Sequence, residues 1–210
     1  MDNFVITIGR EFGSGGMDIA RKLSEKLNVK YYDKELLAMA AKESGLCEEI
    51  FENHDEKPTN SFLYSLVMDT YSVSGYTSAP FLDMPLNHKV FLAQFDTIKK
   101  LAAKESCIIV GRCADYALAE HPNCISVFIH ADMDFRTKHV MSTFDLTEDK
   151  AKDMIHKTDK KRASYYNYYS SKKWGDSRSY NLSLDSSQLG LDGCMEMILK
   201  YMEIKQKNKG

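Results

Sequence analysis

Residues 4–16 read FVITIGREFGSGG, a short β-branched run that leads into a glycine-rich loop. Beyond the loop, Ile19, Ala20, Leu23 and Leu27 recur at helical spacing and predict an amphipathic helix. A strand, a glycine loop and a helix in this order are typical of the first unit of an α/β fold. Glycines let backbone N–H groups turn toward an anion at a helix N-terminus. We therefore predict a phosphate-binding loop formed by Gly13, Ser14, Gly15, Gly16, Met17 and Asp18. A plain connection between strand and helix is the alternative interpretation.

The loop departs from the phosphate-binding sequence G-x-x-x-x-G-K-[ST]. With Gly15 as the second motif glycine, Arg10 stands at the first glycine, Gly16 at the lysine and Met17 at the hydroxyl residue. That lysine normally reaches the β- and γ-phosphates, and the hydroxyl binds magnesium. Arg10 is the candidate for the missing positive charge, and Asp18 is the candidate for contacting magnesium through water.

Four further strand candidates follow along the chain, and helical patterns separate most of them. They are residues 29–32, 107–111, 124–130 and 180–185. Five strands connected through helices predict an α/β, three-layer fold, with a five-stranded parallel sheet and helices on both faces. Ligands in such sheets bind outside the carboxyl ends of the strands.

We expect one domain with two segments added to its core. The predicted core comprises residues 1–32, 87–142 and 180–205, the insertion about 33–86, and a helical lid about 143–179. Asp33 is expected to cap the helix DKELLAMAAKES, and Thr147 the long basic helix of the lid. A further helix is expected around 61–72. The segment 61–86 is either a mobile acceptor-binding loop or the surface of a homodimer.

Charge is strongly separated along the chain, although the net charge is only −2. Residues 33–69 carry nine acidic residues and three Lys, whereas residues 150–178 carry nine Lys or Arg and three Asp. The basic segment attracts phosphate, while a solvated helix face is the plainer interpretation. Its aromatic cluster is interpreted either as core packing or as a nucleic-acid stacking surface; the residues are Tyr165, Tyr166, Tyr168, Tyr169 and Trp174.

Several classes of protein and site are disfavoured. No apolar run approaches the roughly 18 residues of a membrane span, and the N-terminus lacks the pattern of a secretion signal. The five cysteines include no CxxC pair, and the six histidines have no HxxxH or HxxE spacing. We expect a cytoplasmic protein without disulfides, membrane association or a metal site of its own.

Six blocks of sequence, taken in order, make a resemblance specific. They are ITIGREFGSGGMDIARKL, YYDKELL, IIVGRCADYAL, VFIHADMDFR, DKKRASYYNYY and YNLSLDSSQLG. Over nearly the whole chain, they resemble the cytidylate kinase-like family of the P-loop nucleoside monophosphate kinase group. The resemblance implies a P-loop kinase fold that uses ATP and Mg²⁺, an inserted region that closes on the monophosphate, and a lid that contributes arginines.

The resemblance assigns two residues to the acceptor. Asp33 matches the acidic residue that opens the monophosphate-binding helix, although Met39 stands where the family has an arginine. Arg112 matches the arginine that contacts the monophosphate after the third strand. The aspartates expected on either side of that glycine–arginine pair are Val110 and Cys113 here.

Three further residues are assigned to the lid. Arg136 matches the first lid arginine, and Asp159 and Arg162 match an Asp-x-x-Arg pair that approaches the nucleotide. Ile155 replaces another expected arginine. The structural alternative for Asp159 and Arg162 is an ordinary i,i+3 ion pair on one helix. Because phosphoryl transfer depends on neutralising phosphate oxygens, we predict Arg10, Arg136 and Arg162 as the catalytic cations.

We therefore predict ATP-dependent phosphoryl transfer to a nucleoside monophosphate, CMP or dCMP. The alternative is a regulatory protein that binds nucleotide or phosphate and is catalytically impaired, because the loop lysine is missing. A nucleic-acid-binding module is a third interpretation, and the predicted sheet and glycine loop argue against it.

Overall fold

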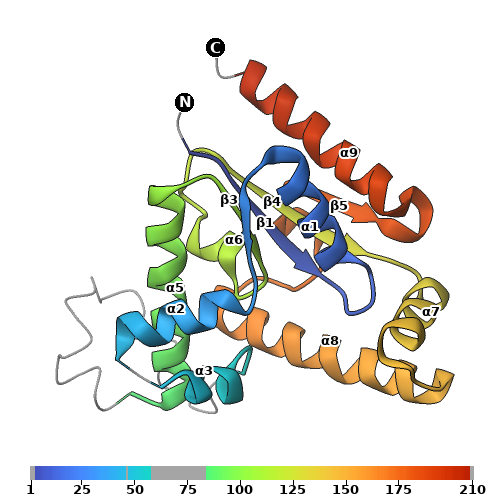
Figure 1. Ribbon diagram of the computed structural model, residues 1–210, viewed down its shortest axis with the longest axis horizontal. Helices are drawn as coiled ribbons and strands as arrows, with labels where there is room; N and C mark the ends of the chain where they lie inside the picture. The colour runs from blue at the N-terminus through green and yellow to red at the C-terminus, as the bar shows by residue number, and fades with distance from the viewer. Residues whose placement is uncertain (1–2, 46, 58–83, 209–210) are drawn as a thin grey trace.

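A computed structural model describes residues 3–45, 47–57 and 84–208 (Figure 1). Its sheet has five parallel strands in the order β2-β3-β1-β4-β5. The strands are β1 (Val5–Arg10), β2 (Lys30–Tyr32), β3 (Cys107–Val110), β4 (Cys124–His130) and β5 (Leu182–Asp185). This sheet confirms the predicted three-layer α/β fold.

Helices cover both faces of the sheet (Figure 1). Helices α1 (Gly16–Leu27) and α9 (Ser186–Lys207) pack on one face. Helices α5 (Leu86–Lys104), α6 (Ala114–Ala117) and α8 (Glu148–Ser170) pack on the other. Helices α2 (Glu35–Ser44) and α3 (Glu48–His54) lie beside α5, and α7 (Met133–Phe144) packs against α8. Among the residues described, no helix is both long and apolar enough to cross a membrane.

The alternation of side chains along β1 explains how one strand serves two layers. Successive side chains of a strand point to opposite faces. Ile6 and Ile8 pack with Ile19 and Leu23 of α1, whereas Val5 packs with Ile98 of α5. All six side chains are fully buried. Burial on both faces accounts for the nearly continuous apolar sequence of the central strands.

The strand order determines where the site forms. Strand β1 lies between β3 and β4, so its carboxyl end is flanked by theirs. Ile8 pairs with Val110, and the Gly111 N–H donates to the Ile8 carbonyl at 3.0 Å. The glycine loop after β1 and the Gly111–Arg112 turn after β3 therefore lie side by side.

The structure corrects one cap and confirms the position of another. Helix α2 starts at Glu35 with Lys34 at the N-cap position and no side-chain cap. The Asp33 cap prediction is therefore wrong, because that carboxylate pairs with Arg112 instead. Thr147 does occupy the N-cap position of α8, without a side-chain hydrogen bond.

Two expectations about the insertion stay open. The helix expected around 61–72, and nearly all of the proposed dimer surface at 61–86, lie outside the described residues. The division into core, insertion and lid remains a proposal.

Candidate active site

The glycine loop joins β1 to α1 in a conformation that needs glycine. Gly13 and Gly15 have φ angles of 81° and 76°, in the left-handed region that side chains disfavour. The Ser14 hydroxyl lies 2.9 Å from the Glu11 carbonyl, and the Ser186 hydroxyl lies 2.7 Å from the Ser14 carbonyl. The loop is therefore braced by a hydrogen bond within itself and by one from the start of α9.

The loop leaves a set of backbone donors available for an anion. Within the described part of the chain, the N–H groups of Gly13, Gly15, Gly16 and Met17 have no hydrogen-bond acceptor. They precede or begin α1, whose N-terminus carries a partial positive charge. Such an arrangement can bind phosphate.

The Arg10 side chain occupies the space that the Cβ of a lysine at position 16 would need. A Cβ atom placed on Gly16 would lie 2.7 Å from the Cβ of Arg10. A lysine at position 16 is therefore incompatible with this path of Arg10. Met17, at the position of the magnesium-binding hydroxyl, packs against the core instead.

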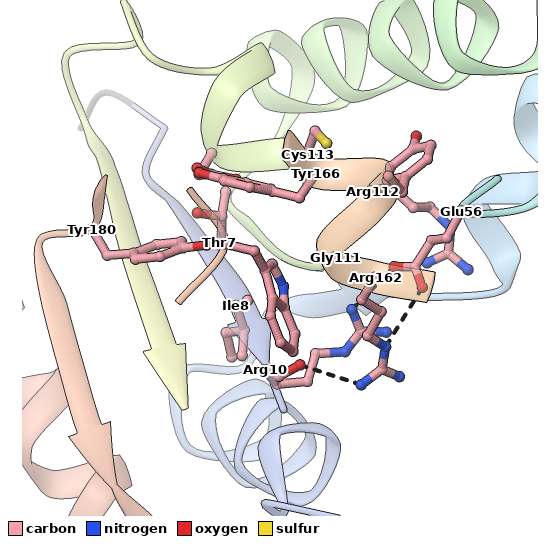
Figure 2. Close-up of a pocket in the computed structure, with 14 residues that line it drawn as sticks. Thr7, Ile8, Arg10, Glu56, Gly111, Arg112, Cys113, Arg162, Tyr166 and Tyr180 are labelled. Atoms are coloured by element: carbon pink, nitrogen blue, oxygen red, sulfur yellow. Dashed lines mark hydrogen bonds and ion pairs between the residues drawn. The ribbon is translucent and has the colours of Figure 1, made fainter. Parts of the chain in front are cut away.

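Arg10 and Arg162 converge on one carboxylate (Figure 2). Arg10 Nη1 lies 3.2 Å from Glu56 Oε1, and Arg162 Nε lies 3.5 Å from Glu56 Oε2. Arg162 also donates from Nη1 to the Arg10 carbonyl at 3.2 Å. Helix α8 thereby brings a second guanidinium to the carboxyl end of β1.

The charges of this group perturb one another. Burial and the neighbouring Arg10 lower the pKa of Arg162 to about 10. Burial by itself would raise the pKa of Glu56, but the arginines around it, Arg10 first, lower it to about 2. At neutral pH Arg162 and Glu56 are therefore both charged.

Arg112 is held in place by two carboxylates. The turn after β3 passes through three left-handed residues, Gly111, Arg112 and Cys113, at φ angles of 75°, 54° and 55°. Arg112 binds Asp55 through Nε at 3.1 Å and Nη2 at 2.9 Å, and Asp33 through Nη1 at 2.9 Å. Burial opposes the charge, yet these carboxylates raise the pKa of Arg112 above its usual value.

Arg136 and Asp159 join the glycine loop to the lid. Arg136 donates from Nε to the Phe12 carbonyl at 2.8 Å and pairs with Glu11 at 3.1 Å. It also pairs with Asp159, which accepts the Phe12 N–H at 2.8 Å. Where the structure describes the chain, Asp159 and Arg162 form no ion pair, so Asp159 serves the loop rather than its own helix.

The remaining predicted residue, Asp18, lies in the first turn of α1. Its carboxylate lies 3.0 Å from Arg21 and 3.6 Å from His139, and about a third of it is exposed. Among the residues described, no three His, Cys, Asp or Glu gather to hold a metal. A magnesium ion carried by nucleotide needs only one or two carboxylates from the protein, and Asp18 is suited to that role.

The aromatic cluster packs as core rather than as a surface. Tyr165, Tyr166 and Tyr169 are at most 5% exposed. Phe91 stacks on Tyr169 at 3.9 Å between ring centroids. The packing interpretation is therefore confirmed for these three tyrosines, and a nucleic-acid stacking surface built from them is excluded.

Sequence reasoning missed Asp55 and Glu56. Nothing in the sequence connects an acidic pair after a short helix with arginines from three distant segments. Two signals were available. The pair lies in the segment between the loops that follow the second and third predicted strands, and residues 33–69 carry an excess of acidic residues.

Comparisons with known proteins agree with this architecture. The chain is similar to an uncharacterized protein from Eubacterium ventriosum ATCC 27560, at 34% identity and a TM-score of 0.71, covering 96% of this chain and 99% of that one. Shikimate kinase from Bacteroides thetaiotaomicron matches at 13% identity and a TM-score of 0.53, covering 95% of this chain and 98% of that one. No curated protein matches.

The likeness to shikimate kinase shows a shared fold alone. The family assignment rests on a match to the cytidylate kinase-like family that spans residues 5–188, nearly the whole chain. With its parallel sheet, glycine loop and arginine-rich edge, the chain belongs to the cytidylate kinase-like family, as the sequence blocks predicted.

Proposed function

We propose that this protein transfers a phosphoryl group from ATP to a nucleoside monophosphate, CMP or dCMP. One observation carries the proposal: loop amides at the N-terminus of α1 that have no acceptor among the described residues adjoin two arginines at the carboxyl end of β1. Membership of a kinase-like family supports phosphoryl transfer as the reaction class. The cytidine acceptor follows from the resemblance to cytidylate kinases.

Each part of the site has a place in this reaction. The amides of Gly13, Gly15, Gly16 and Met17 bind the donor's phosphates. Arg10 and Arg162 offset negative charge on the transferring group, because phosphoryl transfer is catalysed mainly by positioning and charge neutralisation. Arg10 thus takes the part that a loop lysine plays elsewhere.

The acceptor lies on the other side of the same edge. Arg112, with Asp33 and Asp55, positions the acceptor's phosphate and sugar beside the donor. Arg136 and Asp159 hold the lid helix to the loop so that Arg162 stays aligned. Magnesium, bound with ATP, supplies further neutralisation of the phosphates, and Asp18 would hold it through water.

A direct test is a coupled assay with ATP and Mg²⁺ against all nucleoside monophosphates and several small alcohols. We expect turnover with CMP or dCMP above the other acceptors. Turnover with an alcohol but no nucleotide would overturn the acceptor class.

A matched pair of glycine variants tests the loop. Gly15 and Gly45 have φ angles of 76° and 73°, so alanine is comparably strained at both positions. A Cβ on Gly15 would lie 2.4 Å from Leu191, whereas a Cβ on Gly45 meets nothing within 4 Å. Gly15→Ala should weaken ADP binding and Gly45→Ala should not. Equal binding by the two variants would remove the loop from the nucleotide site.

The second candidate is a regulatory protein that binds nucleotide without turnover. The glycine at the lysine position favours it, because that lysine normally reaches the transferring phosphate. Tight ADP binding with no turnover toward any acceptor would establish this function in place of the first.

A further inference from the structure

The end of α3 places an acidic pair inside the arginine group. Asp55 follows the last residue of α3, and Glu56 follows Asp55. We propose that Glu56 is a built-in competitor of substrate phosphate: its carboxylate holds the position between Arg10 and Arg162 and must leave when a phosphate binds there. This inference rests on the proposed function for the identity of the substrate, but its anion chemistry can be tested separately.

The contacts of Glu56 are long for charged partners. Hydrogen bonds between arginine and carboxylate are ordinarily about 2.7–2.9 Å. Glu56 lies 3.2 Å from Arg10 and 3.5 Å from Arg162, and the buried Nε of Arg162 has no hydrogen-bond partner among the described residues. A phosphate offers three oxygens in a tetrahedral arrangement and can satisfy both guanidinium groups better than a planar carboxylate.

The backbone of Glu56 is also unfavourable. Its φ angle is 50°, in the left-handed region that a residue with a Cβ seldom adopts. The ion pairs hold the residue in this conformation. Displacement by phosphate would release the backbone strain, which favours the exchange.

Asp55 provides a fixed point about which Glu56 can move. Both carboxylate oxygens of Asp55 bind Arg112, at 3.1 and 2.9 Å, and Oδ1 also accepts from Gln94 at 3.3 Å. The chain is therefore anchored one residue before Glu56. Displacing Glu56 requires a local swing and does not require α3 to undock.

The charge balance explains why displacement is needed. Arg10, Arg112 and Arg162 contribute three positive charges, and Asp33, Asp55 and Glu56 contribute three negative ones. An incoming phosphate meets a neutral group until Glu56 withdraws. Removing the Glu56 charge should then increase the affinity for anions. In the variant, no carboxylate occupies the position between Arg10 and Arg162, so a larger fraction of the protein can bind an anion.

Calorimetric titration with inorganic pyrophosphate tests this competition. Glu56→Gln should bind pyrophosphate at least about tenfold more tightly than the wild type. Glu49→Gln is the matched control, because it removes the same charge from an exposed position on α3 and should change affinity less than about twofold. Equal or weaker binding by Glu56→Gln, or an equal gain in Glu49→Gln, would overturn the proposal.

Hydrogen exchange on the wild-type protein gives a second readout that does not depend on a variant folding. The Lys57 N–H donates to the His54 carbonyl at 3.2 Å and reports on the chain around Glu56. Pyrophosphate should speed exchange at Lys57 while it slows exchange in the loop of residues 13–17. Slower or unchanged exchange at Lys57 would show that Glu56 is a fixed brace.

The turnover assay separates this inference from the proposed function. Tighter binding by Glu56→Gln without turnover in any variant would support the competitor and remove the kinase. Turnover with unchanged pyrophosphate affinity in Glu56→Gln would support the kinase and remove the competitor.

Discussion

Two arginine–carboxylate groups border the glycine loop, and they are built differently. Arg136 is 5% exposed and binds a backbone carbonyl as well as Glu11 and Asp159, and Asp159 in turn accepts a backbone N–H. Arg10 and Arg162 share one carboxylate through contacts of 3.2 and 3.5 Å. The first group joins side chains to the backbone of the loop, whereas the second holds Glu56, whose φ angle of 50° lies in the left-handed region. Similar residues thus bind the loop backbone in one place and share a single carboxylate in the other, where we propose exchange with phosphate.

The largest effect should come from the second group. Arg10→Ala and Arg162→Ala should each lower kcat by about 10³-fold or more, since arginines that neutralise the transferring phosphate contribute on that scale. Steady-state kinetics together with ATP titrations would show kcat falling far more than ATP binding.

A double variant controls for a trivial cause of that loss. Arg10→Ala leaves Glu56 with one partner fewer, so the variant is repeated with Glu56→Gln. If the double variant regains full turnover, the unpaired carboxylate, and not a lost catalytic cation, explains the effect.

The first group should instead determine stability. Arg136→Met leaves Asp159 and Glu11 without their buried partner, and breaking such a pair costs about 3–5 kcal/mol. Urea unfolding should show this loss, with a smaller loss for Asp159→Asn, which can still accept the Phe12 N–H. A fully stable Arg136→Met protein with a large loss of kcat would place Arg136 in the catalytic group.

Acid titration gives the next largest contrast. The pKa of Glu56 lies at about 2, below the roughly 4.3 expected for an unfolded chain. A lowered pKa stabilises the fold above the unfolded value, and that contribution disappears as the pH falls toward 2. Between pH 5 and 2.5, the wild type should lose about 2 kcal/mol more than Glu56→Gln. Parallel unfolding profiles for the two proteins would contradict the ion pairing of Glu56.

The smallest effect concerns Arg112, which shares features of both groups. Lysine cannot reproduce a guanidinium that binds Asp55 through two donors and Asp33 through a third. Arg112→Lys should raise KM for the acceptor about tenfold, on the scale of one lost charged hydrogen bond, and leave KM for ATP nearly unchanged. A loss of stability without any change in acceptor KM would show that Arg112 has a structural role like that of Arg136.

Local patterns predicted the elements well because each pattern reflects one short segment. The β-branched runs at 4–8 and 124–130 are buried on both faces, and such strands are continuously apolar. The Asp33 cap failed for a long-range reason, because Arg112 attracts that carboxylate from 79 residues away. The preference of Asp33 for a helix N-cap position is weaker than the attraction of its carboxylate to the buried Arg112.

By itself, the sequence determined the α/β fold, the position of the glycine-rich loop and the absence of the motif lysine, since all three depend on local residue type and spacing. Only the tertiary structure decided which carboxylates each arginine contacts. Arg10, Arg136 and Arg162 are alike in sequence as cations near predicted loops. Arg136 meets Glu11 and Asp159, whereas Glu56 reaches Arg10 and Arg162 from across the fold. An ion pair depends on the distance between two side chains in the folded protein, and their separation along the sequence does not specify that distance.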